Sequence, residues 1–237
     1  MEHTYLIRSD SKVADVIDRN PLLLLMLEHL NIPLGLHEKN VEQLCNEFNI
    51  ETTLFLVIAN LYLDRIPDSS QIDKIHDITH IIKYLENSHK HYISEKFPLL
   101  TSYITEISKI NTHPETELLK RFYNDYLVEV TEHLKYENDI VFPYVMSLIA
   151  ENRQSVLAIG NQYTMAEYSS HHDDIEEKLA DLKNLLIRYL PPNQDMQSRR
   201  RLLLTLYELE FDLHIHSLIE EIILIPIVER LEHSIRV

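Results

Sequence analysis

The sequence has few glycines, one cysteine and no tryptophan, and each of these features limits the kinds of fold that the chain can adopt. Two glycines in 237 residues and no tryptophan, beside many Leu, Ile, Glu and Lys residues, indicate long helices and disfavour a turn-rich β fold. Cys45 is the only cysteine, which excludes an intrachain disulfide and a metal site built from several thiolates. We therefore expect an all-α protein in a reducing, cytoplasmic location.

Positive charge and long apolar runs are also in short supply. The formal net charge of −16 would repel a phosphate backbone, so neither nucleic acid nor an anionic membrane is an expected partner. The longest apolar run, residues 22–27, is much too short to span a bilayer, and the N-terminus has no apolar signal core. With 45% apolar residues, the chain can nevertheless bury a full core.

Two stretches, residues 133–143 and 216–226, share the frame His-x3-Glu-x5-Pro. In a helix, a His and a Glu four residues apart lie on one face, so each stretch directs an imidazole and a carboxylate toward one point. Apolar residues at steps of three and four surround both pairs, which indicates that the pairs face a core. Buried ionisable groups are costly unless they are paired or bind a metal. The two pairs are therefore candidate metal half-sites.

The separation of the two frames, 83 residues, recurs in one further pair of histidines. His89 and His172 are 83 residues apart, so each half would be a helical hairpin with one His on its first helix and a His-Glu pair on its second. Helical phase favours His89 over His91 and His172 over His171. The favoured residues align with apolar positions, whereas their neighbours align with polar positions that predict a solvated face.

Six side chains are thus predicted to meet in the protein interior. Four imidazoles and two carboxylates suit a pair of iron ions or, less specifically, zinc or manganese. In a symmetric arrangement each ion has two His ligands and both Glu bridge the ions. An added oxygen bridge still leaves positions for dioxygen, nitric oxide or water. Tyr168, near this set, is expected to be a core residue. The predicted ligands are His89, His133, Glu137, His172, His216 and Glu220.

Four long helical patterns follow a linker predicted at residues 67–71. They cover about residues 72–110, 115–150, 163–189 and 196–231. Their short connections predict an up-down-up-down four-helix bundle over residues 72–234. Residues 1–66 contain shorter amphipathic segments between turn signals and are predicted to form a small N-terminal helical domain. Pro98 is expected to bend or break the first long helix, and the prolines of the two frames to kink theirs or begin a last turn.

The motifs HLKYENDIVFP and HSLIEEIILIP, with the histidine segments SHKHY and HHDDIEEKL, resemble those of the hemerythrin-like (HHE) domain. The whole chain is similar to the di-iron RIC family of iron-sulfur cluster repair proteins, which carry a small N-terminal helical domain before the bundle. This resemblance implies a non-haem di-iron centre with two bridging Glu and a cytoplasmic location. It also implies a role in restoring iron-sulfur proteins after nitrosative or oxidative stress.

The chain departs from this family in its N-terminal domain. Where the family usually has two adjacent cysteines, residues 32–36 read Ile-Pro-Leu-Gly-Leu, and Cys45 lies further along. Two functions therefore stay open. One is repair of iron-sulfur proteins, and the other is reversible binding or sensing of dioxygen or nitric oxide. The sequence assigns neither a catalytic residue nor an oligomeric state, and a homodimer is among the open states.

Overall fold

The computed structural model describes residues 5–150, 164–165, 168 and 175–236, and every regular element in these ranges is helical. The predicted all-α class is confirmed for this part of the chain. No helix in the same ranges is long and apolar enough to cross a membrane. The chain divides into two compact units, residues 1–88 with 215–237, and residues 89–214.

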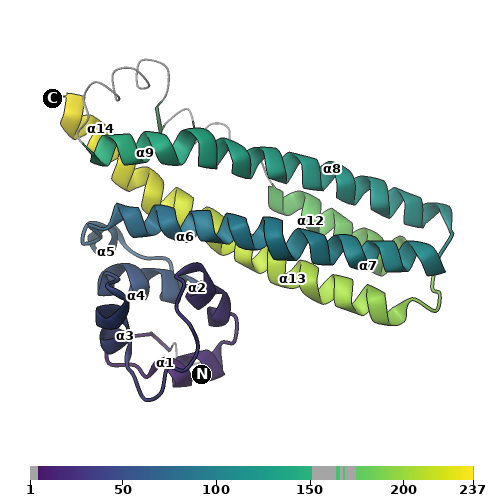
Figure 1. Cartoon of the computed structure of the whole chain (residues 1–237), viewed down its shortest axis with the longest axis horizontal. Coiled ribbons are helices and arrows are strands. Elements are labelled where there is room, and N and C mark those ends of the chain that lie inside the picture. Colours follow the sequence, from purple (N-terminus) through teal and green to yellow (C-terminus); the bar gives the residue numbers. More distant parts are fainter. Residues whose placement is uncertain (1–4, 151–163, 166–167, 169–174, 237) are drawn as a thin grey trace. The chain divides into compact units, whose positions relative to one another are not determined.

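The first unit contains the N-terminal helices and the C-terminal helix (Figure 1). Its buried centre includes Met26, Leu54 and Ile58. Asn60 exchanges two hydrogen bonds with the backbone of Ile7, at 3.0 and 3.1 Å, and so ties the segment before the first helix to the fourth. The elements are α1 (Val13–Arg19), α2 (Leu23–His29), α3 (Val41–Phe48), α4 (Thr52–Leu61), α5 (Ser69–Ile72), most of α6 (Ile78–His91), η4 (Ile219–Leu224) and α14 (Ile225–Arg236).

Two helices of this unit begin with a reciprocal cap. Asn40 before α3 and Asp68 before α5 each accept a hydrogen bond from the backbone N–H of the glutamine three residues later. The side chains of those glutamines in turn accept from the backbone N–H of the cap residue. Such a capping box satisfies N–H groups that have no partner inside the helix. Both helix starts are therefore fixed by local sequence.

The second unit is built from long helices around one apolar core (Figure 1). Helix α8 packs against both α7 and α12. Lys183 of α12 forms an ion pair with Glu210 of α13, and Ser198 of α13 donates a 2.9 Å hydrogen bond to Glu106 of α7. The elements are η1 (Tyr92–Lys96), α7 (Phe97–Ile110), α8 (Pro114–Tyr136), η2 (Glu137–Val141), α9 (Phe142–Ile149), α12 (Ile175–Asn184), η3 (Leu185–Tyr189) and most of α13 (Met196–Leu218).

These contacts place α7, α8, α12 and α13 around a shared core. The complete up-down-up-down bundle over residues 72–234 stays a prediction, as do the N-terminal domain at residues 1–66 and the linker at residues 67–71. Within that linker range, the short helix α5 begins at Ser69.

Four π-helical turns occur in the described residues, and each ends two residues before a proline. The residue directly before the proline donates its N–H to the carbonyl five positions earlier, instead of four. The four bonds run from Phe97 to Tyr92, from Phe142 to Glu137, from Leu190 to Leu185 and from Ile225 to Glu220.

The widened turns explain how the prolines are accommodated. A proline ring inside an α-helix clashes with the carbonyl four residues earlier, and proline has no N–H to donate. A π turn changes the spacing of the hydrogen bonds at that point, and the helix continues past Pro98, Pro143 and Pro226. At Pro191 the helix ends with the π turn instead. The chain is accordingly not broken at Pro98, because α6, η1 and α7 follow one another without a gap.

Candidate metal centre

Glu137 is a buried carboxylate of the second unit, and two imidazoles face it. It lies where α8 passes into η2 and is 0% exposed. His133, one turn earlier, places Nε2 2.9 Å from Glu137 Oε1. His89 places Nε2 3.2 Å from Glu137 Oε2. Each carboxylate oxygen of Glu137 therefore contacts a different histidine.

The charge of Glu137 is set by two opposing effects. Burial alone would raise the pKa of this carboxyl group. The hydrogen bonds and charges of His133 and His89 outweigh burial and hold the pKa well below its usual value of 4.5. Glu137 is therefore an ionised carboxylate, which is the form that binds metal ions.

Asn138 orients the ring of His89. The carbonyl oxygen of the Asn138 side chain lies 3.0 Å from His89 Nδ1. A carbonyl oxygen can only accept a hydrogen bond, so Nδ1 carries the proton and a neutral His89 has its lone pair on Nε2. The Nε2 lone pair then faces the ionised Glu137, and two acceptors facing each other require a cation between them. A proton or a metal ion would satisfy both atoms.

The first unit contains a second pair of the same kind. His216 and Glu220 are 3% and 0% exposed, and Nε2 of His216 lies 3.3 Å from Glu220 Oε1. Ser88 Oγ lies 2.8 Å from the other ring nitrogen of His216, Nδ1. The Ser88 hydroxyl donates its one proton to the carbonyl of Leu85 at 2.7 Å, so it must accept from His216 Nδ1–H. A neutral His216 would therefore present the lone pair of Nε2 to Glu220, as a neutral His89 would to Glu137.

This pattern is typical of metal ligands. A histidine that binds a metal through one ring nitrogen almost always donates the N–H of the other nitrogen to a fixed acceptor. His89 and His216 both do so, to Asn138 and Ser88 respectively. The structure therefore contains His and Glu groups that could bind metal.

Both glutamates of the sequence repeat coincide with π turns. Glu137 and Glu220 supply the carbonyls that accept the widened hydrogen bonds of η2 and η4. In each frame the proline follows its glutamate by six residues, which is the spacing that the four observed turns share. Since π turns occur frequently at functional sites, the proline of the frame has a structural role beside the ligands.

The remaining site predictions have mixed outcomes. His172 and His171 lie outside the described residues. The predicted solvent exposure of His91 is wrong, because only 7% of this residue is exposed. Its polar neighbours on the same helical face, Tyr84 and Ser88, are buried as well. The polar residues of this helical face therefore do not indicate exposure to solvent.

Three residues beside the ligands did not stand out in the sequence. Ser88 and Asn138 are ordinary polar residues next to His89 and Glu137 in the chain, and adjacency is the only signal that could have suggested them. Tyr168 is buried, as predicted, but its hydroxyl also donates a 2.6 Å hydrogen bond to Glu137 Oε1. It is therefore a partner of the candidate ligand as well as a core residue.

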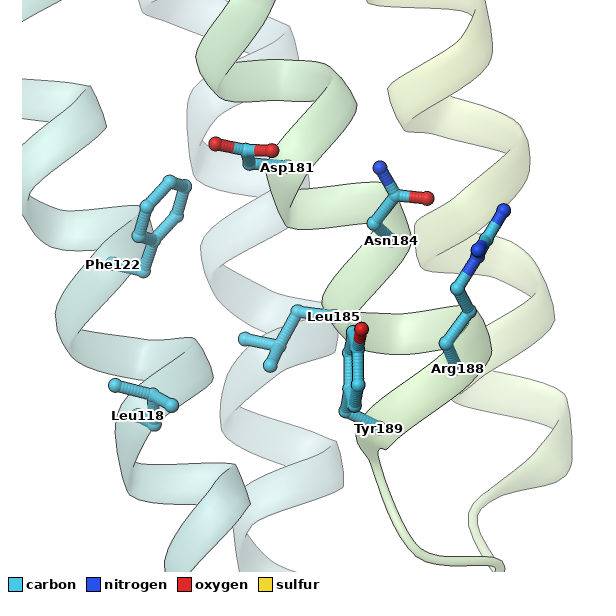
Figure 2. Close-up of a pocket in the computed structure, with 7 residues that line it drawn as sticks. All are labelled: Leu118, Phe122, Asp181, Asn184, Leu185, Arg188 and Tyr189. Atoms are coloured by element: carbon cyan, nitrogen blue, oxygen red, sulfur yellow. The ribbon is translucent and has the colours of Figure 1, made fainter.

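A shallow groove also occurs in the second unit, away from these ligands. It has a volume of about 370 Å³ and lies between α8 and the segment formed by α12 and η3 (Figure 2). Leu118 and Phe122 line one side, while Asp181 and Arg188 on the other bring charges of opposite sign. None of the predicted metal ligands that the structure describes lines it.

Comparison with known proteins finds relatives in staphylococci. The iron-sulfur cluster repair protein ScdA of Staphylococcus haemolyticus is 24% identical over 150 residues, which cover 62% of this chain and 66% of that protein. The proteins of the same name from two strains of Staphylococcus epidermidis are each 21% identical over 225 residues, 92% of this chain and 98% of theirs. The chain is similar to iron-sulfur cluster repair proteins. No family model and no solved structure matches it.

Proposed function

We propose that this chain is a non-haem di-iron protein of the hemerythrin-like type that takes part in iron-sulfur cluster repair under nitrosative or oxidative stress. The observation that carries the proposal is a pair of buried imidazoles, His89 and His216, whose Nε2 atoms lie 3.2 and 3.3 Å from buried carboxylates in the two units separately. The names of relatives that match over 92% of the chain support the repair role.

The proposed centre contains two iron ions with an oxygen bridge. The residues that would hold these ions are His89, His133, Glu137, His172, His216 and Glu220. Imidazole and carboxylate together suit iron, and also zinc or manganese. Bound iron would supply redox chemistry and open coordination positions for a diatomic ligand, dioxygen or nitric oxide.

The residues around this centre have separable tasks. Asn138 and Ser88 hold the rings of His89 and His216 through Nδ1, with Nε2 directed toward the carboxylates. Tyr168 fixes Oε1 of Glu137 through its hydroxyl. Since Ser88 and Tyr168 are buried, they also limit access of water to the ligands. No catalytic residue is assigned.

The wider setting of the proposal follows the sequence. We expect the centre to lie inside an up-down-up-down four-helix bundle over residues 72–234, preceded by a helical domain at residues 1–66. Damaged iron-sulfur proteins would be the macromolecular partners. The expected location is cytoplasmic, and a homodimer is one oligomeric state to be tested.

Metal analysis with absorption spectroscopy tests the cofactor. The purified full chain, reconstituted with iron without oxygen, should bind two irons per chain, and its spectrum should change on addition of dioxygen or nitric oxide. Parallel reconstitution with zinc and manganese establishes the preference. Absence of all three metals after reconstitution would contradict a metal centre of any kind.

The sequence departure in the N-terminal domain favours a second function, reversible binding or sensing of dioxygen or nitric oxide. The family's cysteine pair is replaced in residues 32–36, and Cys45 is fully buried. A repair assay separates the two functions. An iron-sulfur enzyme inactivated by nitric oxide should recover activity when the iron-loaded chain is added. No recovery, in conditions where an authentic repair protein restores activity, would leave binding or sensing as the function.

A further inference from the structure

A cavity in the first unit has a different chemical character from the rest of this acidic chain. Its volume is about 180 Å³, and its lining includes Lys83 and His80 of α6 together with His29 of α2. The side chains of Asn31 and Asn87 add two amides. None of the described residues that line it is Asp or Glu, although the chain has 38 acidic and 22 basic residues.

One wall of the cavity is fixed by buried groups. His29 and Tyr84 are each 1% exposed, and their rings meet edge to face with centroids 5.2 Å apart. The Tyr84 hydroxyl is 2.9 Å from that of Tyr62. Asn87 donates a 2.8 Å hydrogen bond to the backbone carbonyl of His29, which joins α6 to the end of α2. These contacts hold the wall in place before any ligand arrives.

The charges near the cavity leave Lys83 as its available cation. Asp77 is engaged by His80, through the backbone N–H and the ring Nδ1 of that residue. Glu51 accepts hydrogen bonds from the backbone N–H groups of residues 76 and 77, at 2.9 Å each. Lys83 forms no ion pair with any residue that the structure describes. An ammonium group beside a cavity with amide donors and no carboxylate in its lining attracts an anion.

The rest of the lining determines the kind of anion. Phe48 and Ile50 contribute apolar surface, and the Tyr84 ring contributes an aromatic face. A hydrated inorganic anion would leave the apolar surface of the cavity in contact with water. An organic anion with an apolar body would cover that surface and displace the water. We propose that this cavity binds a small organic carboxylate, with its charged end at Lys83 and its apolar body against Phe48, Ile50 and Tyr84.

Calorimetric titration of the purified, metal-loaded full chain with benzoate, and separately with inorganic phosphate, tests the proposal. Benzoate should bind saturably and more tightly than phosphate. Lys83→Glu should weaken benzoate binding by about tenfold or more, as expected for the loss of a charge-assisted contact and its replacement by a like charge. Lys83→Arg, which keeps the charge, should retain binding. Lys74→Glu is the matched control, because Lys74 is exposed and outside the lining.

Each contrary outcome is decisive. Benzoate that binds the metal instead of the cavity would bind Lys83→Glu and the unchanged chain equally, and this equality would overturn the proposal. Phosphate binding as tight as that of benzoate would overturn the organic class of ligand. Circular dichroism of each variant establishes that it is folded, which is expected because Lys83 is exposed.

Discussion

Ser88 accepts a hydrogen bond of 2.8 Å from Nδ1–H of His216, a residue 128 positions later in the chain. The direction follows from the second contact of the hydroxyl, which donates to the backbone carbonyl of Leu85. His216 is therefore held as the tautomer whose Nε2 can bind a metal. Replacing this acceptor should weaken the site without removing any ligand.

We expect Ser88→Ala to lower metal affinity about 10- to 100-fold, the usual cost of losing the acceptor behind a ligating histidine. Competition with a chelator under anaerobic conditions measures the change. Ser94→Ala is a close control. Ser94 also donates to a backbone carbonyl of its own helix, at 2.6 Å, but it is exposed and contacts no predicted ligand. Equal affinities for the two variants would refute a role for Ser88 in orienting His216.

His216→Ala should abolish one of the two metal positions. The ion that His216 would help to hold keeps only one imidazole beside the carboxylates, and the loss of a nitrogen ligand weakens the binding of a divalent ion. Metal content after reconstitution should fall from two ions per chain to one. His214→Ala is the control, since His214 is exposed and two positions away on the helix. Unchanged stoichiometry in His216→Ala would remove His216 from the ligand list.

Tyr168→Phe tests the hydroxyl that binds Glu137. The hydrogen bond is buried and charge-assisted, so its loss should lower the free energy of unfolding by about 1.5–3 kcal/mol. Denaturant unfolding of the metal-free chain measures the difference. Tyr189→Phe removes a hydroxyl from a side chain that is 66% exposed and should have little effect. A Tyr168→Phe variant as stable as Tyr189→Phe would mean that water replaces the hydroxyl at Glu137.

The His-Glu ligand pairs could be predicted from the sequence, but the residues that orient them could not. His-x3-Glu spacing is a local property of a helix, so the contacts of Glu137 with His133 and of Glu220 with His216 could be predicted from spacing alone. The contact of Asn138 with His89 joins positions 49 residues apart and depends on how two helices pack. No periodicity encodes such a contact, which is why Ser88 and Asn138 were missed.

The prolines show a similar limit. A single proline in a helical pattern predicts a kink, a last turn or a break. All four observed turns place a π-type hydrogen bond directly before the ring, and the helix continues past Pro98, Pro143 and Pro226 but ends before Pro191. The periodicity of apolar residues predicts which residues are helical, but it does not report a local change from four-residue to five-residue bonding.

Cys45 should be unreactive in the folded chain, which bears on whether it can replace the absent cysteine pair. Burial raises the pKa of this thiol from 9.0 to about 11, against the smaller opposing effect of a hydrogen bond with Thr52. Near neutral pH it is therefore a thiol and not the nucleophilic thiolate. Iodoacetamide should alkylate it far more slowly in the native chain than in denaturant at the same pH.

Because the pKa of the Cys45 thiol is raised by folding, this group's contribution to stability is complete below pH 9 and is lost as the pH rises through about 11. Rapid alkylation of the native chain at pH 7 would contradict this assignment and would restore Cys45 as a candidate for thiol chemistry in repair.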